Sequence, residues 1–166
     1  MAADGILITL EALVVPRAAN PTALDEAPAA LRRIGWIGRP LVIVGTHVAD
    51  RQLPLDDDER EAWVRGTLGA GAFALVPFEA PMPERGTDGA GRAGEQWRSL
   101  RDANDATWLV TDTATHVGPA RKAGLKVIVI GPSDPDPGVQ RPDYQARDLR
   151  DAIGHLLAVD VFAAPR

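Results

Sequence analysis

Residues 107–131 constrain the fold more than any other part of the chain. They read TWLVTDTATHVGPARKAGLKVIVIG, with apolar runs at 108–110 and 127–130 on either side of a segment rich in small residues. Two apolar, β-rich runs joined by a helix-sized segment predict a strand, a crossover helix and a second strand. Asp112 lies where the first strand ends, and ligands of open α/β sheets bind at the carboxyl ends of the strands. The stretch therefore predicts a parallel sheet with a carboxylate at its ligand-binding edge.

The rest of the chain repeats this alternation of strands and helices. Further strands are predicted at 5–10, 41–44 and 73–76, and helices at 25–34, 55–68, 95–101 and 147–157. Asp25 is the expected N-cap of the first helix, and Gly35 is its expected stop. Five strands with helical or helix-sized connections predict an α/β fold of three layers, built on a doubly wound parallel sheet.

The segments between these elements are polar or rich in glycine. The acidic run at 56–61 is expected to complement a helix N-terminus rather than to hold a metal. The segment 86–94, GTDGAGRAG, has no apolar anchor and lacks the context of a phosphate-binding loop, so a mobile surface loop is expected. Trp97 lies on a charged helix beside it, which makes Trp97 the candidate for an exposed contact residue.

Composition narrows the class of protein. A chain of 166 residues is expected to form a single domain over residues 1–166. The net charge of −5, without a dominant basic stripe, argues against a nucleic-acid partner. No run approaches the roughly 20 apolar residues of a membrane span, and no signal peptide is recognisable. Cysteine is absent, which excludes disulfides and thiolate chemistry. We expect a cytoplasmic protein without a membrane partner.

The strand ends carry a series of short motifs. The first strand continues into EALVVP at 11–16, the second ends in GTH at 45–47, APMP stands at 80–83, and TDTATH stands at 111–116. In this order and spacing the series resembles the four motifs of the haloacid dehalogenase (HAD) superfamily, over about residues 6–157. The resemblance implies the strand order 5-4-1-2-3, with strands one and four adjacent. Neither connection where family members insert a cap domain is long enough for one. The chain is therefore most similar to the capless branch, which includes histidinol-phosphate and heptose-bisphosphate phosphatases.

The resemblance implies hydrolysis of a phosphate ester, but the residues that carry this chemistry are replaced. The nucleophilic aspartate of the family falls on Thr9, its general acid/base on Glu11, and its charge-neutralising lysine on Ala80. A threonine hydroxyl has a very high pKa and needs a base to attack phosphorus. Glutamate would misplace the proton by on the order of 1 Å, which can cost ~100-fold in rate. Three arginines could substitute for the lysine: Arg85, Arg98 and Arg101.

The binding positions are partly kept. Thr46 falls on the phosphate-binding hydroxyl, where it would bind an anion or only cap the following turn. The first metal-binding acid is kept as Asp112, and the second falls on His116. With Asp112 as the one carboxylate in place, Mg²⁺ would bind weakly, so no cofactor is expected. A different metal is an alternative, because Glu11, His47, Asp112 and His116 would all lie near the carboxyl edge and such ligands suit zinc or manganese.

Three hypotheses follow from these replacements. The first is a pseudo-phosphatase, a HAD-like scaffold that has lost catalysis and serves as a binding, regulatory or assembly module for a protein partner or a second copy. The second is a divergent phosphate-ester hydrolase with relocated catalytic residues. The third is a metal or anion site of a new kind. The first is favoured, because Thr9 stands in place of the nucleophile. The resemblance implies that Thr9 and Asp112 end adjacent central strands, with their side chains converging on one point.

Overall fold

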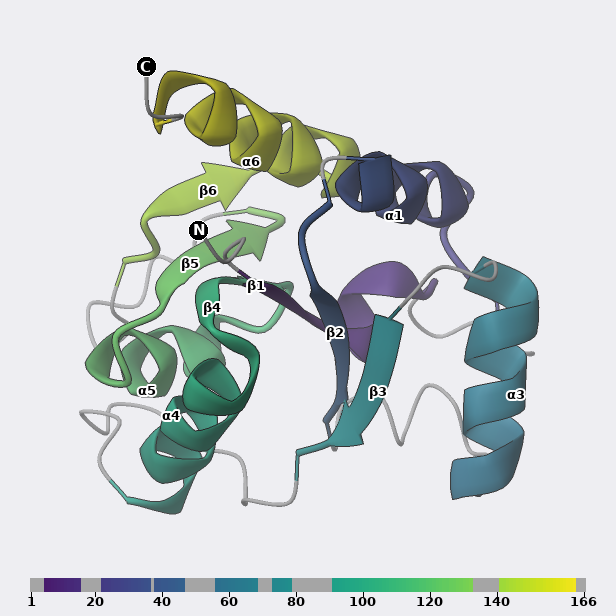
Figure 1. Cartoon of the computed structure of the whole chain (residues 1–166), viewed down its shortest axis with the longest axis horizontal. Helices are drawn as coiled ribbons and strands as arrows, with labels where there is room; N and C mark the ends of the chain where they lie inside the picture. Colours follow the sequence, from purple (N-terminus) through teal and green to yellow (C-terminus); the bar gives the residue numbers. More distant parts are fainter. Residues whose placement is uncertain are drawn as a thin grey trace.

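One parallel sheet organises the structure. The structure is a computed structural model, and it describes residues 5–15, 22–36, 38–46, 56–68, 73–78, 91–132 and 141–163. The strands of the described residues follow the order β3-β2-β1-β4-β5-β6 (Figure 1). They are β1 (Gly5–Thr9), β2 (Leu41–Gly45), β3 (Phe73–Pro77), β4 (Ala106–Thr111), β5 (Lys126–Ile130) and β6 (Tyr144–Ala146). The five predicted strands therefore stand in the predicted order, and β6 extends the sheet beyond β5.

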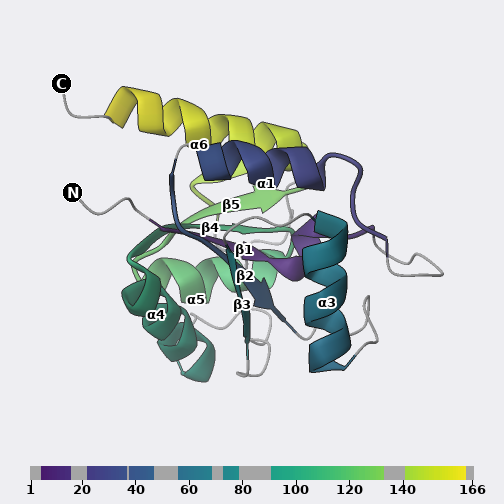
Figure 2. The same ribbon diagram turned by 45° about the vertical axis from the view of Figure 1, so that its right-hand side comes forward.

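Helices cover both faces of this sheet, as the prediction of three layers requires. On one face lie α1 (Ala27–Trp36), α3 (Asp57–Leu68) and α6 (Leu149–Ala163), and on the other lie α4 (Arg92–Asn104) and α5 (Val117–Lys122) (Figures 1 and 2). Two short 3-10 helices, η1 (Leu10–Leu13) and η2 (Ala114–His116), follow β1 and β4. Along β1, Ile6 and Ile8 belong to the first core and Leu7 to the second. Burial on both faces is the reason that the strand is apolar throughout.

The boundaries of α1 differ from the predicted ones. The helix begins at Ala27, two residues after the predicted cap Asp25, and it continues through Gly35 to Trp36. Gly35 does not stop the helix, because the left-handed backbone is adopted three residues later by Gly38, whose φ is 73°. The amide of Gly38 donates to the carbonyl of Gly35 at 3.0 Å, which closes the last turn.

The acidic residues before α3 act as helix caps. The backbone N–H of Glu59 donates to Asp56 Oδ1 at 2.8 Å, and the N–H of Asp56 points back to Glu59 Oε2 at 3.4 Å. This reciprocal pair is a capping box, which satisfies amides that the first turn leaves without partners. The predicted role of this acidic run at a helix N-terminus agrees with these contacts.

The start of α4 overturns two expectations. Its first turn contains residues 92–94, so this part of the predicted surface loop is helical, with Ala93 and Gly94 buried; residues 86–90 lie outside the described residues. Trp97, the predicted exposed contact residue, is fully buried. Once the helix begins at Arg92, Ala93, Trp97 and Leu100 fall on one face at helical spacing and pack against the second core. Of the charged residues around Trp97, Glu95 and Arg98 are exposed.

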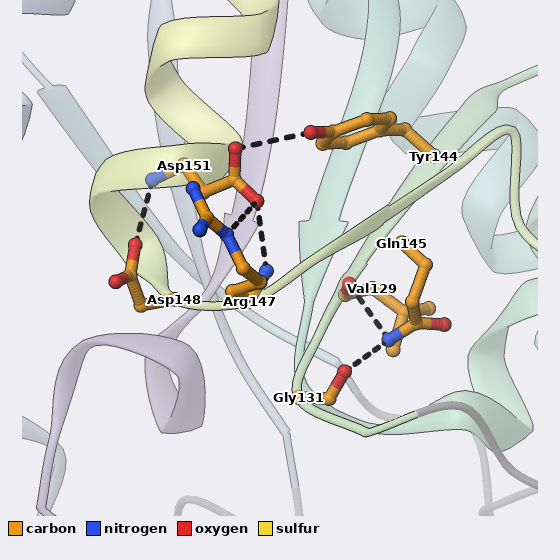
Figure 3. A network of polar contacts seen from close by, with 7 residues as sticks. All are labelled: Val129, Gly131, Tyr144, Gln145, Arg147, Asp148 and Asp151. Atoms are coloured by element: carbon orange, nitrogen blue, oxygen red, sulfur yellow. Dashed lines mark hydrogen bonds and ion pairs between the residues drawn. The ribbon is translucent and has the colours of Figure 1, made fainter.

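The strand that sequence analysis missed, β6, connects β5 to α6. It has only three residues, two of them polar, so its pattern is too short to distinguish from a turn. Gln145 Nε2 donates to the carbonyl groups of Val129 and Gly131, and Tyr144 Oη donates to Asp151 Oδ1 at 3.0 Å (Figure 3). The helix that was predicted at 147–157 begins at Leu149. The side chain of Asp148, the residue before it, accepts a hydrogen bond of 2.7 Å from the backbone amide of Asp151.

Two glycines of this fold are predicted to respond to alanine in opposite ways. Gly124 has a φ of +91° after α5, where a Cβ atom would also collide with the guanidinium of Arg101. Gly124→Ala should therefore lower the free energy of unfolding by roughly 1–2 kcal/mol, the penalty of a left-handed alanine. Gly154 lies within α6, where an added Cβ atom would meet no atom of a neighbouring described element within 4 Å. Gly154→Ala should raise stability by about 0.5–1 kcal/mol.

Urea denaturation of the two variants and the parent protein measures both changes. A Gly124→Ala protein as stable as the parent would contradict the left-handed turn after α5.

Candidate functional site

Polar residues meet at the carboxyl ends of β1, β2 and β4. Thr9 ends β1 and Thr111 ends β4, while Thr46 follows β2 directly. Because the three strands are parallel neighbours, these ends lie at one edge of the sheet, and Glu11 in η1 and His116 in η2 lie just beyond it. All five side chains are buried, with at most 1% of each residue exposed.

Thr9, which the sequence analysis aligned with the family nucleophile, contacts the neighbouring strand β4. Its hydroxyl donates to Thr111 Oγ1 at 3.1 Å. The same Thr111 oxygen accepts the backbone N–H of Thr113 at 3.1 Å. The hydroxyl of Thr9 thus bonds to Thr111, the residue before Asp112. The expectation that the side chains of Thr9 and Asp112 converge on one point stays a prediction.

Glu11 lies at the centre of the site. Its Oε2 atom accepts a hydrogen bond from Thr46 Oγ1 at 2.7 Å, and its Oε1 atom accepts one from Thr113 Oγ1 at 3.2 Å. Burial raises the pKa of Glu11 to about 7, an effect that the hydroxyl of Thr46 opposes and the nearby charge of Asp112 reinforces. The carboxyl group is thus partly protonated at neutral pH.

Asp112 differs from Glu11 in its surroundings. Its side chain is exposed, although the protein around its carboxyl group is crowded enough that desolvation raises its pKa. The hydroxyl of Thr113 lies 3.2 Å from Asp112 Oδ1 as well as from Glu11 Oε1, and its single hydrogen can serve one carboxyl group at a time. Thr113 therefore links the exposed acid to the buried one.

His116 occupies an aromatic enclosure. Its ring meets those of Phe78 and Trp97 edge-on, with centroids 5.6 Å and 5.3 Å away. Burial lowers the pKa of His116 to about 4, so the imidazole is neutral. Its Nε2 atom lies 3.9 Å from Glu11 Oε1, beyond hydrogen-bond distance. Within the described residues, neither ring nitrogen has a hydrogen-bond partner.

The structure thus brings together most of the residues that the sequence singled out. Thr9, Glu11, Thr46 and His116 are neighbours, and Asp112 lies at their exposed margin. His47, Ala80 and Arg85 lie outside the described residues. Arg101 donates a hydrogen bond to the carbonyl of Ala123, directly after α5. Four residues of the site were not predicted as site residues from the sequence: Phe78, Trp97, Thr111 and Thr113. Thr111 and Thr113 flank Asp112 directly in the chain.

The residues present do not fit the magnesium ion that the resemblance to HAD phosphatases implies. Mg²⁺ requires several oxygen ligands in near-octahedral geometry. Here Thr9 supplies no charge, Glu11 is held by two hydroxyls, and Asp112 is the one exposed carboxylate of the three positions. In the described ranges, no group of three or more His, Asp and Glu side chains is arranged to hold a metal. The zinc or manganese alternative also involves His47, outside those ranges, and stays a prediction.

Solved structures show which class of protein has this architecture. The chain superposes on D,D-heptose 1,7-bisphosphate phosphatase from B. bronchiseptica, complexed with magnesium and phosphate, with a TM-score of 0.63 and 14% identity over 93% of this chain and 98% of that one. The enzyme of the same name from Burkholderia thailandensis gives a TM-score of 0.66 and 12% identity over 93% and 99%. L-2-haloacid dehalogenase from Xanthobacter autotrophicus gives a TM-score of 0.56 and 12% identity over 88% of this chain and 63% of that one.

The protein therefore has the fold of the haloacid dehalogenase superfamily, and the residues that the structure describes include no cap domain. Sequence identities of 14% and below establish a shared fold but do not establish a shared chemistry. The sequence matches no protein-family model and no curated protein. No helix in the described part of the chain is both long and apolar enough to cross a membrane.

Burial of Glu11 and His116 gives stability two opposing dependences on pH. Between pH 4.5 and 7 the folded protein keeps a proton on Glu11 that the unfolded chain releases, so this contribution falls as pH rises. Between pH 4 and 6.5 the unfolded chain holds a proton on His116 that the folded protein lacks, so this contribution rises with pH. In the parent protein the two effects offset each other over most of this range.

Single substitutions should separate the two effects. Glu11→Gln removes the Glu11 contribution, so the free energy of unfolding relative to the parent should rise between pH 4.5 and 7. His116→Phe keeps a ring against Phe78 and Trp97 but removes the His116 contribution, so its stability relative to the parent should fall between pH 4 and 6.5. Each change should approach roughly 3 kcal/mol at most, at about 1.36 kcal/mol per pKa unit. Denaturation at a series of pH values measures them, and two profiles parallel to the parent's would contradict the buried pair.

Proposed function

We propose that this protein is a catalytically degenerate member of the HAD superfamily, a pseudo-phosphatase that serves as a binding, regulatory or assembly module. The observation that carries the proposal is the state of Thr9. At the end of the first strand, where the mechanism needs a carboxylate, a buried hydroxyl donates to Thr111. A threonine hydroxyl has a very high pKa, and one that already donates its hydrogen to another residue is a poor nucleophile.

The remaining site residues support the same conclusion. Thr46, which would bind a phosphoryl oxygen, donates its hydrogen to Glu11. Glu11 and Asp112 both bring acid groups to a place where phosphate binding requires positive charge, and His116 is held neutral by burial. Transition states of phosphoryl transfer are stabilised chiefly by cations and donors aimed at the phosphoryl oxygens. This arrangement offers few of them to a substrate.

The partner of such a module is proposed to be a protein or a second copy of this chain. A net charge of −5 disfavours nucleic acid, and a cytoplasmic location without membrane contact is proposed on the same composition. Size-exclusion chromatography with light scattering would separate self-association from a monomer that awaits another partner.

A divergent phosphate-ester hydrolase is the second candidate, favoured by one observation. The pKa of Glu11 is raised to about 7, and a general acid/base works best when its pKa lies near the operating pH. In this alternative Glu11 would transfer the proton, and relocated residues would supply the nucleophile and the charge. The buried position of Glu11 argues against it, because a substrate would first have to open the site.

Steady-state assays on generic phosphomonoesters with magnesium distinguish the two candidates. We predict turnover well below ~1 s⁻¹, the lower end of the usual enzyme range. The matched variants are Asp112→Asn and Glu11→Gln within the site and Asp58→Asn on the exposed surface of α3. Turnover at or above that rate, lost in the two site variants and kept in Asp58→Asn, would overturn the pseudo-phosphatase proposal.

A further inference from the structure

The carboxyl group of Glu11 is bound as a separate anion would be. Each oxygen receives a hydroxyl hydrogen bond from a different part of the chain, Oε2 from Thr46 after β2 and Oε1 from Thr113 after β4. Glu11 itself belongs to η1, which follows β1. One buried carboxyl group thus connects the ends of three neighbouring strands.

The surroundings of this carboxyl group have the chemistry of an oxyanion site. Two hydroxyl donors converge on it, and the imidazole of His116 lies 3.9 Å from Oε1 with both nitrogens unpartnered among the described residues. A neutral imidazole carries one N–H, which can donate to an oxygen placed slightly closer. His116 thus presents a polar ring atom to the same carboxyl group that the two hydroxyls contact.

We propose that Glu11 is the internal ligand of an oxyanion-binding site, and that its carboxyl group occupies the position between Thr46 and Thr113 that a free oxyanion would take. This inference rests on the proposed function, since it explains why the anion site of a phosphatase fold is not available to a substrate. The ligand class is a small oxyanion, a carboxylate or inorganic phosphate.

Electrostatics keep a free oxyanion out while Glu11 is in place. Asp112 lies near enough for its charge to act on Glu11, and a second anion would add to this repulsion. In the described part of the chain, no lysine or arginine is among the groups whose charge or hydrogen bonds shift the pKa of Glu11. The hydroxyl of Thr46 has one hydrogen, so it cannot donate to Glu11 and to a free anion at once.

Chemical rescue tests this assignment. Glu11→Ala removes four heavy atoms, a methylene carbon and a carboxylate, and acetate contains the same four. At pH 7 we expect Glu11→Ala to melt several degrees below the parent. Acetate should recover this loss saturably, since a ligand that binds only the folded state raises the melting temperature. Chloride at equal ionic strength should not, and the parent protein should not respond to acetate. Inorganic phosphate, run in parallel, shows whether the vacated site accepts a larger oxyanion.

A matched pair of second substitutions localises the effect. In the Glu11→Ala background, Thr46→Val should abolish the acetate response, and Thr67→Val, on the exposed surface of α3, should leave it intact. Butyrate should rescue less than acetate, because its longer chain exceeds the space that Glu11 vacates. Equal responses to acetate and chloride, or a response that survives Thr46→Val, would overturn the proposal.

A double-mutant cycle covers the case in which Glu11→Ala does not fold in any buffer. Glu11→Met keeps the length of the side chain but removes its acceptors. Thr46→Val should lower the folding equilibrium constant at least about fivefold in the parent and have little effect in the Glu11→Met background. Strictly additive effects would overturn the proposal. Phosphatase turnover in the parent would instead overturn the proposed function and leave the acetate response unchanged, so the two failures are distinguishable.

Discussion

The parallel pairing of β1 with β2 on one side and β4 on the other is the constraint on which the rest of the structure depends. Ile8 lies opposite Ile43 in β2 and opposite Val110 in β4, so the three strands end level with one another. Strands buried on both faces must be apolar along their length, and polar groups can appear only where they end. The pairing therefore decides that Thr9, Thr46 and Thr111 become neighbours across long stretches of sequence.

Once these ends are level, the polar groups satisfy one another. Threonine hydroxyls donate and accept within the site, and the pair formed by Thr9 and Thr111 has no need of an external ligand. Glu11 is buried among hydroxyls and beside a second acid, and it adapts by a pKa raised to about 7. Burying a charge is expensive, so a carboxyl group in such a place holds a proton more tightly. This edge of the sheet thus contains hydroxyls, a neutral imidazole and a partly protonated acid.

Much of the fold could be predicted because its signals are local. The apolar runs at 108–110 and 127–130 predict the ends of β4 and β5 to within two residues. The five predicted strands stand in the order that the motifs implied. The errors arose where the local signal was ambiguous. β6 is a three-residue edge strand, Gly35 continues a helix, and Trp97 faces the core because α4 begins three residues earlier than predicted. A shift of the helix start changes which face each residue occupies, and the sequence alone does not specify that start.

The sequence by itself determined which chemical groups stand at the strand ends, since the presence of threonine at position 9, glutamate at position 11 and aspartate at position 112 is a matter of residue identity. Only the tertiary structure decided which of these groups interact. It directs the hydroxyl of Thr9 to Thr111, and it places Glu11 between the hydroxyls of Thr46 and Thr113. It encloses His116 between Phe78 and Trp97. The physical reason is that hydrogen bonds and desolvation depend on distances of a few ångströms between residues separated by tens of positions, and strand register and helix packing fix those distances.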